Sequence, residues 1–242
     1  MIKKRLNTKI VILCGGMGKR LGKITKKIPK PMVKLGKFRI IEQKIRYYKK
    51  QGLRDFIFCL GYKNKVIKKF LKKIAPDGIF YESGIKPGIL KRIYLARKSF
   101  SKTTIISYGD TLAKINFNDL LKKHIKSKAM LTLVVSPLKN PFGIVEWNNS
   151  KKVTAFKEKP IFNHFIGYAV IEPKIFKFLP KNIIDLRDGD GLVKAIKKLS
   201  SKRLVNAYTF DGLNMTVNSS NELREAKIKI GKYYTFDEIL QK

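Results

Sequence analysis

Short apolar runs alternate with amphipathic segments along much of the chain, and this alternation predicts the order of its strands and helices. Apolar runs of strand length occur at 9–14, 55–60, 78–82, 103–109, 130–136, 143–147, 152–158, 165–173 and 204–210. Between the early runs, apolar residues recur at helical spacing in 40–52, 64–74, 88–100 and 117–128. Strands that alternate with helices of this length are typical of βαβ units and a mainly parallel sheet.

The C-terminal half departs from this rhythm. From about residue 130 to 173 the predicted strands follow one another with short links, which favours an antiparallel portion. No linker or internal repeat interrupts the chain. We therefore expect one α/β domain over residues 1–242, with a mixed, mainly parallel sheet flanked by helices and a small antiparallel inset in the C-terminal half.

Charge is the unusual feature of the composition. Lys and Arg total 54 against 17 Asp and Glu, a formal net charge of +37. A polyanionic partner is one explanation. Only ten of these cations are Arg, however, and the lysines are spread over the whole length, whereas nucleic-acid readers favour clustered basic residues with interleaved aromatics. We favour compositional drift of an AT-rich coding sequence, so a nucleic-acid partner is not expected.

Neither cysteine usage nor hydropathy indicates export or membrane insertion. Cys14 and Cys59 are too few for a disulfide framework, and both lie in apolar runs where we expect them to be buried. No apolar stretch approaches the roughly 20 residues of a membrane span. The basic start is followed by too short an apolar run for a signal peptide. We expect a cytoplasmic protein without a membrane partner.

Candidate chemistry begins where the first predicted strand ends. Gly15, Gly16 and Gly18 follow the run 9–14, and ligands of open parallel sheets bind at the carboxyl ends of strands. The spacing matches neither the dinucleotide fingerprint nor the Walker loop. Arg20 offers a planar fork of donors for phosphate oxygens, and Lys30 offers a compact charge on a segment stiffened by two flanking prolines. The residues between them are expected to form a loop over a triphosphate.

The stretch CGGMGKRLGKITKKIPKPM, residues 14–32, resembles the signature of sugar-1-phosphate nucleotidylyltransferases, roughly GG-x-G-[TK]-R-L…T…PKP. Further matches cover nearly the whole chain: YGD (108–110), FG (142–143), FKEKP (156–160) and IGYAVIEPKIF (166–176). Among subfamilies, PKPMVKLG, CLGYKNKVIKKF (59–70) and LKRI (90–93) are most similar to glucose-1-phosphate cytidylyltransferases. The resemblance implies a Rossmann-like fold with a nucleotide-binding half over about 1–128 and a sugar-binding half over about 129–242.

The resemblance also implies roles for individual residues. Arg20 would hold the β- and γ-phosphates, and Lys30 would bridge the α-phosphate and the sugar phosphate. Asp110 would hold Mg²⁺, the implied cofactor. The remaining implied contacts are Leu13, Gly15, Gly16, Gly18, Lys19 and Gly88 with the nucleotide, and Gly143, Glu158, Lys159 and Gly167 with the sugar phosphate.

The implied reaction needs no general base. A sugar 1-phosphate oxygen attacks the α-phosphorus of a nucleoside triphosphate, and pyrophosphate leaves. The attacking phosphate is already ionised at neutral pH, since its second pKa is near 6, so catalysis consists of holding two anions together and stabilising charge. We therefore expect neither His124, in a helix, nor His164, expected in a loop before a strand, to be catalytic.

Two segments depart from the family pattern. Family members usually carry a second metal carboxylate near the C-terminal end, but residues 213–223 read LNMTVNSSNEL. Thr216 and Asn218 stand there instead. Asn218 would be a weak, neutral metal ligand. Asp211 is the alternative carboxylate, although it lies several residues earlier in the chain than the family position. The base-reading loop, ESGIKPGIL at 82–90, is shortened and carries a proline, which leaves the base open.

Three functions therefore stand beside one another. The first is a cytidylyltransferase that uses CTP and glucose 1-phosphate to make a nucleotide-sugar for a surface polysaccharide. The second is a guanylyl- or uridylyltransferase acting on mannose or heptose 1-phosphate. The third is a nucleotide-binding relative with weakened or lost activity. Sugar, base and oligomeric state stay open, a homo-oligomer included.

Overall fold

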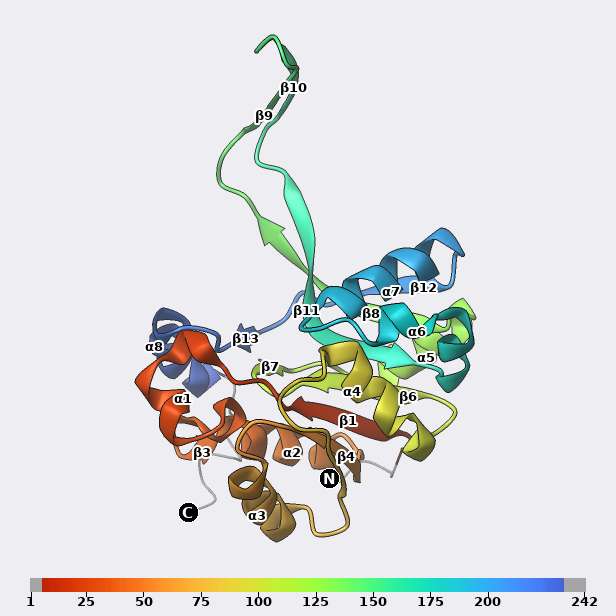
Figure 1. Ribbon diagram of the computed structural model, residues 1–242. Helices are drawn as coiled ribbons and strands as arrows, with labels where there is room; N and C mark the ends of the chain where they lie inside the picture. The colour runs from red at the N-terminus through yellow and green to blue at the C-terminus, as the bar shows by residue number, and fades with distance from the viewer. Residues whose placement is uncertain (1–5, 233–242) are drawn as a thin grey trace.

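The computed structural model describes residues 6–232. Seven strands of this part of the chain form one continuous sheet (Figure 1). Its order is β12-β8-β11-β6-β1-β4-β5. The bounds of these strands are β1 (Lys9–Cys14), β4 (Asp55–Leu60), β5 (Ile79–Glu82), β6 (Thr104–Tyr108), β8 (Leu131–Lys139), β11 (Ile161–Ile171) and β12 (Val205–Thr209). Strands from both halves of the chain therefore share one sheet.

Strand direction confirms the mixed, mainly parallel sheet. β1 pairs in parallel with β4 and β6, β4 with β5, and β12 with β8. β11 is antiparallel to both of its neighbours, β6 and β8, with a register shift between Phe165 and Ala169. The sequence thus predicted the antiparallel portion, which lies inside the main sheet.

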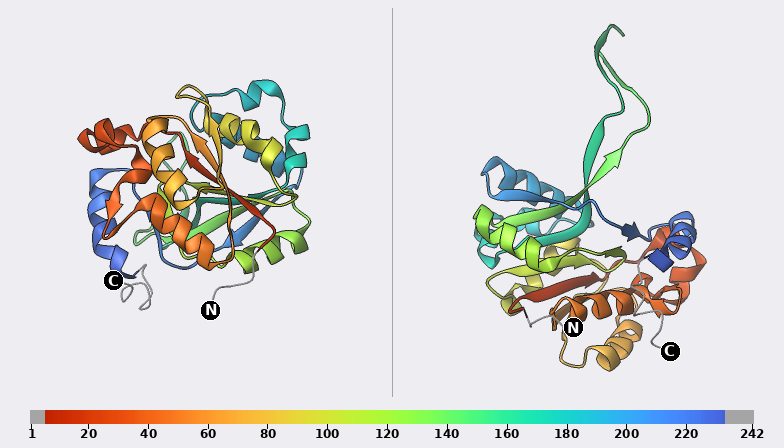
Figure 2. Two further views of the ribbon diagram at one scale, coloured as in Figure 1. Left: turned by 90° about the horizontal axis from the view of Figure 1, so that it is seen from below. Right: turned by 180° about the vertical axis from the view of Figure 1, so that it is seen from behind.

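Helices cover both faces of the sheet (Figures 1 and 2). Ile10 and Ile12 of β1 belong to one buried cluster, and Val11 belongs to another, as the two-residue period of a strand requires. α2 (Ile40–Lys50), α3 (Asn64–Ile74) and α5 (Phe117–Ser127) contribute to the first cluster; α4 (Ile89–Ala96), α6 (Lys181–Ile184) and α7 (Asp190–Ser201) contribute to the second. A β1 buried on both faces explains why its run is apolar throughout.

A smaller cluster joins the two ends of the chain beside the glycine-rich segment. It contains Leu21, Val33 and Leu35 from the first forty residues, and Leu223 and Ala226 from α8 (Ser220–Lys229). The other small elements are α1 (Lys23–Lys27), β2 (Lys34–Leu35), β3 (Phe38–Arg39), β7 (Thr111–Ala113) and β13 (Asn214–Thr216). β7 and β13 pair with each other. Short 3-10 turns occupy Lys19–Leu21, Lys30–Met32, Arg97–Ser99, Pro173–Phe178 and Ile230–Lys232.

α8 begins with a capping box. The Ser219 side chain accepts from the backbone N–H of Glu222, and the Glu222 carboxylate accepts from the backbone N–H groups of Asn218 and Ser219. Three backbone donors are thereby satisfied where helix N-termini leave them free. The cap fixes the backbone of Asn218, a candidate metal ligand.

Several local predictions were wrong. The segment between Arg20 and Lys30 is not a plain loop, because it contains the short helix α1. His164 lies inside β11, since β11 begins four residues earlier than its apolar run. The helix predicted over 88–100 ends at Ala96 and continues as a 3-10 turn.

The strands predicted at 143–147 and 152–158 form a ribbon outside the sheet. β9 (Ile144–Trp147) and β10 (Val153–Lys157) pair only with each other among the described strands. We call residues 140–160 the arm. It continues from the ends of β8 and β11 and projects away from the body in both side views (Figures 1 and 2).

Candidate active site

A cavity of about 1120 Å³ opens at the carboxyl ends of β1 and β6, where the sheet changes direction at β11. This is where open α/β sheets bind ligands. Ten residues proposed from the sequence line it: Leu13, Gly15, Gly16, Gly18, Lys19, Arg20, Lys30, Gly88, Asp110 and Gly167. The fold thus brings most of the residues that we expected to contact nucleotide and phosphate together at one site.

The glycine-rich turn is fixed by contacts with Thr25 and Lys30. Gly18 has φ 63°, the left-handed conformation that glycine adopts without strain. A Cβ on Gly18 would lie 3.0 Å from the Thr25 methyl and 3.2 Å from Lys30 Cβ. The Thr25 hydroxyl donates to the Gly18 carbonyl at 3.0 Å. The spacing of this motif therefore reflects packing between its two ends.

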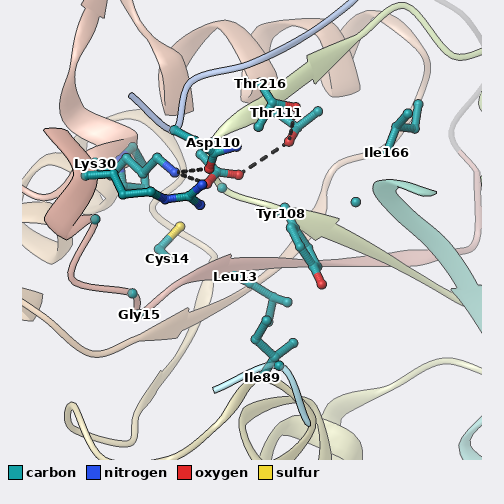
Figure 3. A pocket seen from close by; sticks show the side chains of 18 of the residues that line it. Leu13, Cys14, Gly15, Lys30, Ile89, Tyr108, Asp110, Thr111, Ile166 and Thr216 are labelled. Atoms are coloured by element: carbon teal, nitrogen blue, oxygen red, sulfur yellow. Dashed lines mark hydrogen bonds and ion pairs between the residues drawn. The ribbon is translucent and has the colours of Figure 1, made fainter. Parts of the chain in front are cut away.

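Lys30 lines the cavity and points toward Asp110 (Figure 3). The residue is only 8% exposed, and its ammonium donates to Asp110 Oδ2 and, at 2.7 Å, to Asn218 Oδ1. The segments after β6 and before α8 therefore meet here. The backbone N–H of Val217 also donates to the Asp110 carbonyl at 3.1 Å. Asn218 thus lies beside Asp110, where a second metal carboxylate was expected.

This oxygen pair fits a hard divalent cation. Asp110 Oδ2 and Asn218 Oδ1 converge on one cationic group, Lys30 Nζ, and Mg²⁺ is typically held by one or two protein oxygens together with phosphates and waters. Within residues 6–232, no group of three or more His, Cys, Asp or Glu side chains is placed to hold a metal by itself. Asp211 is exposed and does not line the cavity. A metal here would therefore rely on the ligand's phosphates.

The two motif cations differ in setting. Arg20 and its neighbour Lys19 are exposed at the rim, where they can meet an incoming polyphosphate without displacing protein partners. Lys30 is instead buried and ion-paired with Asp110. Its pairing offsets the desolvation of a buried ammonium.

The cavity wall formed by residues 83–89 is braced by Arg92, which the sequence did not single out. The Arg92 guanidinium donates to Ser83 Oγ at 2.6 Å and to the carbonyls of Gly84 and Ile85 at 2.8 and 3.2 Å. A Cβ on Gly15 would lie 2.5 Å from that guanidinium. Gly15 is thus needed for close packing against Arg92.

Gly88 and Gly167 are also close-approach positions. A Cβ on Gly88 would clash with the Leu186 carbonyl. Gly167, with φ 78°, lies against the Tyr108 ring, 2.9 Å from where its Cβ would be. Burial raises the pKa of Tyr108 to about 12, helped by the Asp110 charge, so Tyr108 offers a neutral hydroxyl. Tyr108 belongs to the YGD match at 108–110, but the resemblance implied no role for it.

Three proposed sugar-facing residues lie outside the cavity lining. Gly143, Glu158 and Lys159 belong to the arm. Glu158 and Lys159 are exposed and approach each other at 3.6 Å. A Cβ on Gly143 would meet the Phe156 ring at 2.6 Å.

The histidines occupy different environments. His124 is buried, and its Nδ1 hydrogen-bonds the Thr132 hydroxyl at 2.7 Å; burial lowers its pKa. His164 lines the cavity on β11. No Ser or Cys side chain is hydrogen-bonded to either ring in the described chain. Both cysteines are free and buried, as predicted.

A buried lysine supports the strand that follows Asp110. Lys44 of α2 donates to the Thr111 carbonyl and, at 2.7 Å, to the Tyr168 hydroxyl. Its side chain is 1% exposed. Burial lowers its pKa to about 7, and the Asp110 charge opposes that shift. Lys44 thus connects α2, β7 and β11 beneath the cavity.

Together, the sheet, the switch point and the cationic, glycine-lined cavity are typical of α/β proteins that bind nucleotides. Comparison with known proteins makes this specific. Residues 9–214 match the family model described as nucleotidyl transferase, and the chain belongs to that family.

Curated relatives agree with this assignment, and a solved structure shares the fold. A “Probable glucose-1-phosphate cytidylyltransferase” of Bacillus subtilis is 30% identical over 90% of this chain and 94% of its own length. The glucose-1-phosphate cytidylyltransferase of Salmonella typhimurium is 31% identical over 76% of this chain and 79% of its own. The crystal structure of HddC from Yersinia pseudotuberculosis shares the fold, with a TM-score of 0.70, 20% identity, and 92% and 99% of the two chains covered.

Among residues 6–232, no helix combines the length and apolar character that crossing a bilayer requires.

Replacing Lys44 with Met is expected to change how stability depends on pH. The folded pKa of about 7 lies below the unfolded value of about 10.4. Between these values the unfolded chain binds more protons, so this group makes the unfolding free energy rise with pH. Urea unfolding from pH 6 to 9 should show the advantage of wild type over Lys44→Met growing above pH 7.

Lys37→Met, at an exposed lysine in the turn between β2 and β3, provides the control and should shift stability by the same amount at every pH. Parallel pH profiles for wild type and Lys44→Met would contradict the lowered pKa.

Proposed function

We propose that this protein is a sugar-1-phosphate nucleotidylyltransferase that uses CTP and glucose 1-phosphate and releases pyrophosphate. Membership of the nucleotidyl transferase family supports the reaction class. The glucose-1-phosphate cytidylyltransferases that match most of this chain support the choice of base and sugar. Such an enzyme would supply an activated sugar for polysaccharide synthesis.

The observation that carries the proposal is the Lys30 cluster. An ammonium at the floor of a large cavity is held by one carboxylate and one amide oxygen. A site for joining two phosphates must position two anions and neutralise charge that moves onto pyrophosphate. Lys30 supplies a buried cation, and Arg20 supplies an exposed cation at the rim of the same cavity.

The proposed mechanism uses these residues for binding and charge stabilisation. The backbone turn at Gly15–Gly18 receives the triphosphate, and Arg20 holds its outer phosphates. Lys30 faces the α-phosphate and the phosphate of the sugar, so both reacting groups share one cation. The sugar phosphate attacks as an anion, and no protein group has to remove a proton.

Mg²⁺ is the cofactor we propose, held by Asp110 and Asn218 together with the nucleotide. When bound, the ion would offset negative charge on the phosphates. Asn218 is neutral, so the protein itself contributes a single negative charge at this position. We therefore expect the metal to arrive mainly with the nucleotide.

A second base and sugar combination has support of its own. The D-glycero-alpha-D-manno-heptose 1-phosphate guanylyltransferase of Aneurinibacillus thermoaerophilus is 34% identical over 62% of this chain. HddC has also been solved with GMP-PN, in a structure that shares the fold at a TM-score of 0.69 and 20% identity. GTP and heptose 1-phosphate are therefore the alternative substrates.

Pyrophosphate release over a grid of four nucleoside triphosphates and several sugar 1-phosphates, with Mg²⁺ present, tests the substrate choice. CTP with glucose 1-phosphate should give the highest kcat/KM. A maximum for GTP with heptose 1-phosphate would replace the proposal by its alternative. Nucleotide binding without turnover in any combination would identify a non-catalytic relative.

Replacing Lys30 with Met or Arg20 with Ala should each lower kcat at least about a hundredfold, because each removes a cation that faces charge shifted in the transition state. Lys30→Met keeps an apolar stem in the buried position. Steady-state kinetics are the measurement, and Lys37→Met serves as the control for loss of one positive charge. Near-wild-type kcat in either variant would remove that residue from the mechanism.

Asn218→Asp should lower the Mg²⁺ concentration required for half-maximal activity several-fold, because a charged oxygen replaces a neutral one beside Asp110. Asp110→Asn should abolish the response to metal. A Mg²⁺ titration of turnover compares them, with Asp211→Asn as the matched control outside the cavity. An unchanged midpoint in Asn218→Asp would mean that residue 218 does not face the metal.

A further inference from the structure

One part of the cavity is lined by apolar side chains. Leu13 and Ile89 pack against the same buried cluster and point toward one another (Figure 3). Ile85 and Pro87 line the cavity from the segment that precedes α4. The polar lining lies on other strands, at Ser136, His164, Asn214 and Thr216. We call Leu13, Ile85, Pro87 and Ile89 the apolar wall.

The apolar wall suits the flat ring of a nucleotide base. Phosphates are expected at Arg20 and Lys30, and a sugar carries hydroxyl groups that match the polar lining. The base is the part of the two substrates whose faces bury well against aliphatic side chains. We therefore expect the base at the apolar wall, and this placement rests on the proposed function.

The apolar wall contributes mainly shape to base recognition. Its four side chains neither donate nor accept hydrogen bonds. The carbonyls of Gly84 and Ile85 already accept from Arg92. The backbone N–H of Ile89 donates to the Asp188 carbonyl at 2.8 Å. A side chain that distinguishes one base from another by its polar edge must therefore come from a neighbouring segment.

Asp188 is the charged residue that adjoins the apolar wall. It lines the cavity from the connection between α6 and α7. Its carbonyl oxygen lies 2.9 Å from where a Cβ on Gly88 would be, and it also accepts from Ile89. Its φ of 48° is a left-handed conformation that Asp and Asn tolerate better than most residues with a Cβ. The start of α4 thus fixes the backbone of Asp188.

The Asp188 carboxylate is free to accept hydrogen bonds from a ligand. The other acidic residues that line the cavity have partners. Asp110 pairs with Lys30. Glu222 caps α8, and Glu225 pairs with a lysine one turn further along that helix. In the described part of the chain, no hydrogen bond or ion pair involves the Asp188 side chain.

We propose that Asp188 is a specificity-determining residue that accepts a hydrogen bond from the exocyclic amino group of cytosine. A carboxylate accepts hydrogen bonds and cannot donate them, and Asp or Glu pairs with the cytosine amino group where proteins read bases. UTP carries a carbonyl oxygen at the same ring position, which would place one acceptor against another. Asp188 thus favours CTP over UTP, whereas the apolar wall accepts both rings equally.

Isothermal titration calorimetry of CTP and UTP, with Mg²⁺ and without sugar phosphate, tests this role independently of turnover. Wild type should bind CTP at least about tenfold more tightly than UTP. Asp188→Asn should bring the two dissociation constants close together, because an amide can donate to the uracil oxygen as well as accept from the amino group. Asn also tolerates the left-handed conformation, so the variant should keep the fold, which circular dichroism checks.

Asp190→Asn is the matched control. It removes the same charge in the first turn of α7, outside the cavity lining, and should leave the ratio of the two constants unchanged. Equal affinities in wild type, or a ratio that does not respond to Asp188→Asn, would overturn the proposal. A variant that loses only a preference for CTP over dCTP would overturn it as well, because the carboxylate would then bind a ribose hydroxyl.

Turnover of wild type keeps this result apart from the proposed function. A maximum with GTP and heptose 1-phosphate, or no pyrophosphate release at all, would count against the proposed function, while the binding ratio would still decide the role of Asp188. If CTP and glucose 1-phosphate give the highest kcat/KM but the ratio ignores Asp188→Asn, only the inference about Asp188 is wrong.

Discussion

The contact of Lys30 with Asp110 and Asn218 holds the site together. It joins three segments that are far apart in the chain: the proline-flanked turn, the end of the β6 segment and the lead into α8. None of these segments is fixed by the main sheet alone. The small cluster around Leu21 and Leu223 packs behind these segments and includes Leu112 and Val217, which are close in sequence to Asp110 and Asn218, so an apolar cluster beside the site helps to position the residues that contact Lys30.

The first half of the fold and the core of the site were predictable because their signals are local. Strands 9–14 and 55–60 have the predicted ends, since each is buried on both faces and bounded by polar turns. Gly18, Arg20 and Lys30 belong to one motif of fewer than twenty residues. The Ser219 cap was predictable because a capping box needs only two residues three positions apart.

Other features depend on contacts between distant residues and leave no local pattern. In the sequence, Arg92 and Lys44 cannot be told from other basic residues on helices. Their roles become visible only in the fold, which places backbone carbonyl groups within hydrogen-bond distance of them. β7 and β13 are three residues each and exist through their pairing with one another. In the arm, the apolar runs predicted two strands correctly, but the local pattern did not show that these strands pair with each other outside the main sheet.

Arg92 has a consequence for ligand selection. Its guanidinium already holds Ser83, Gly84 and Ile85, so this wall of the cavity is ordered before a ligand arrives. Binding there does not have to restrict a free loop, a step that normally subtracts from affinity. The cost of ordering was met when the chain folded, so this wall can favour one ligand over another by shape alone, as a rigid template and not as a closing lid.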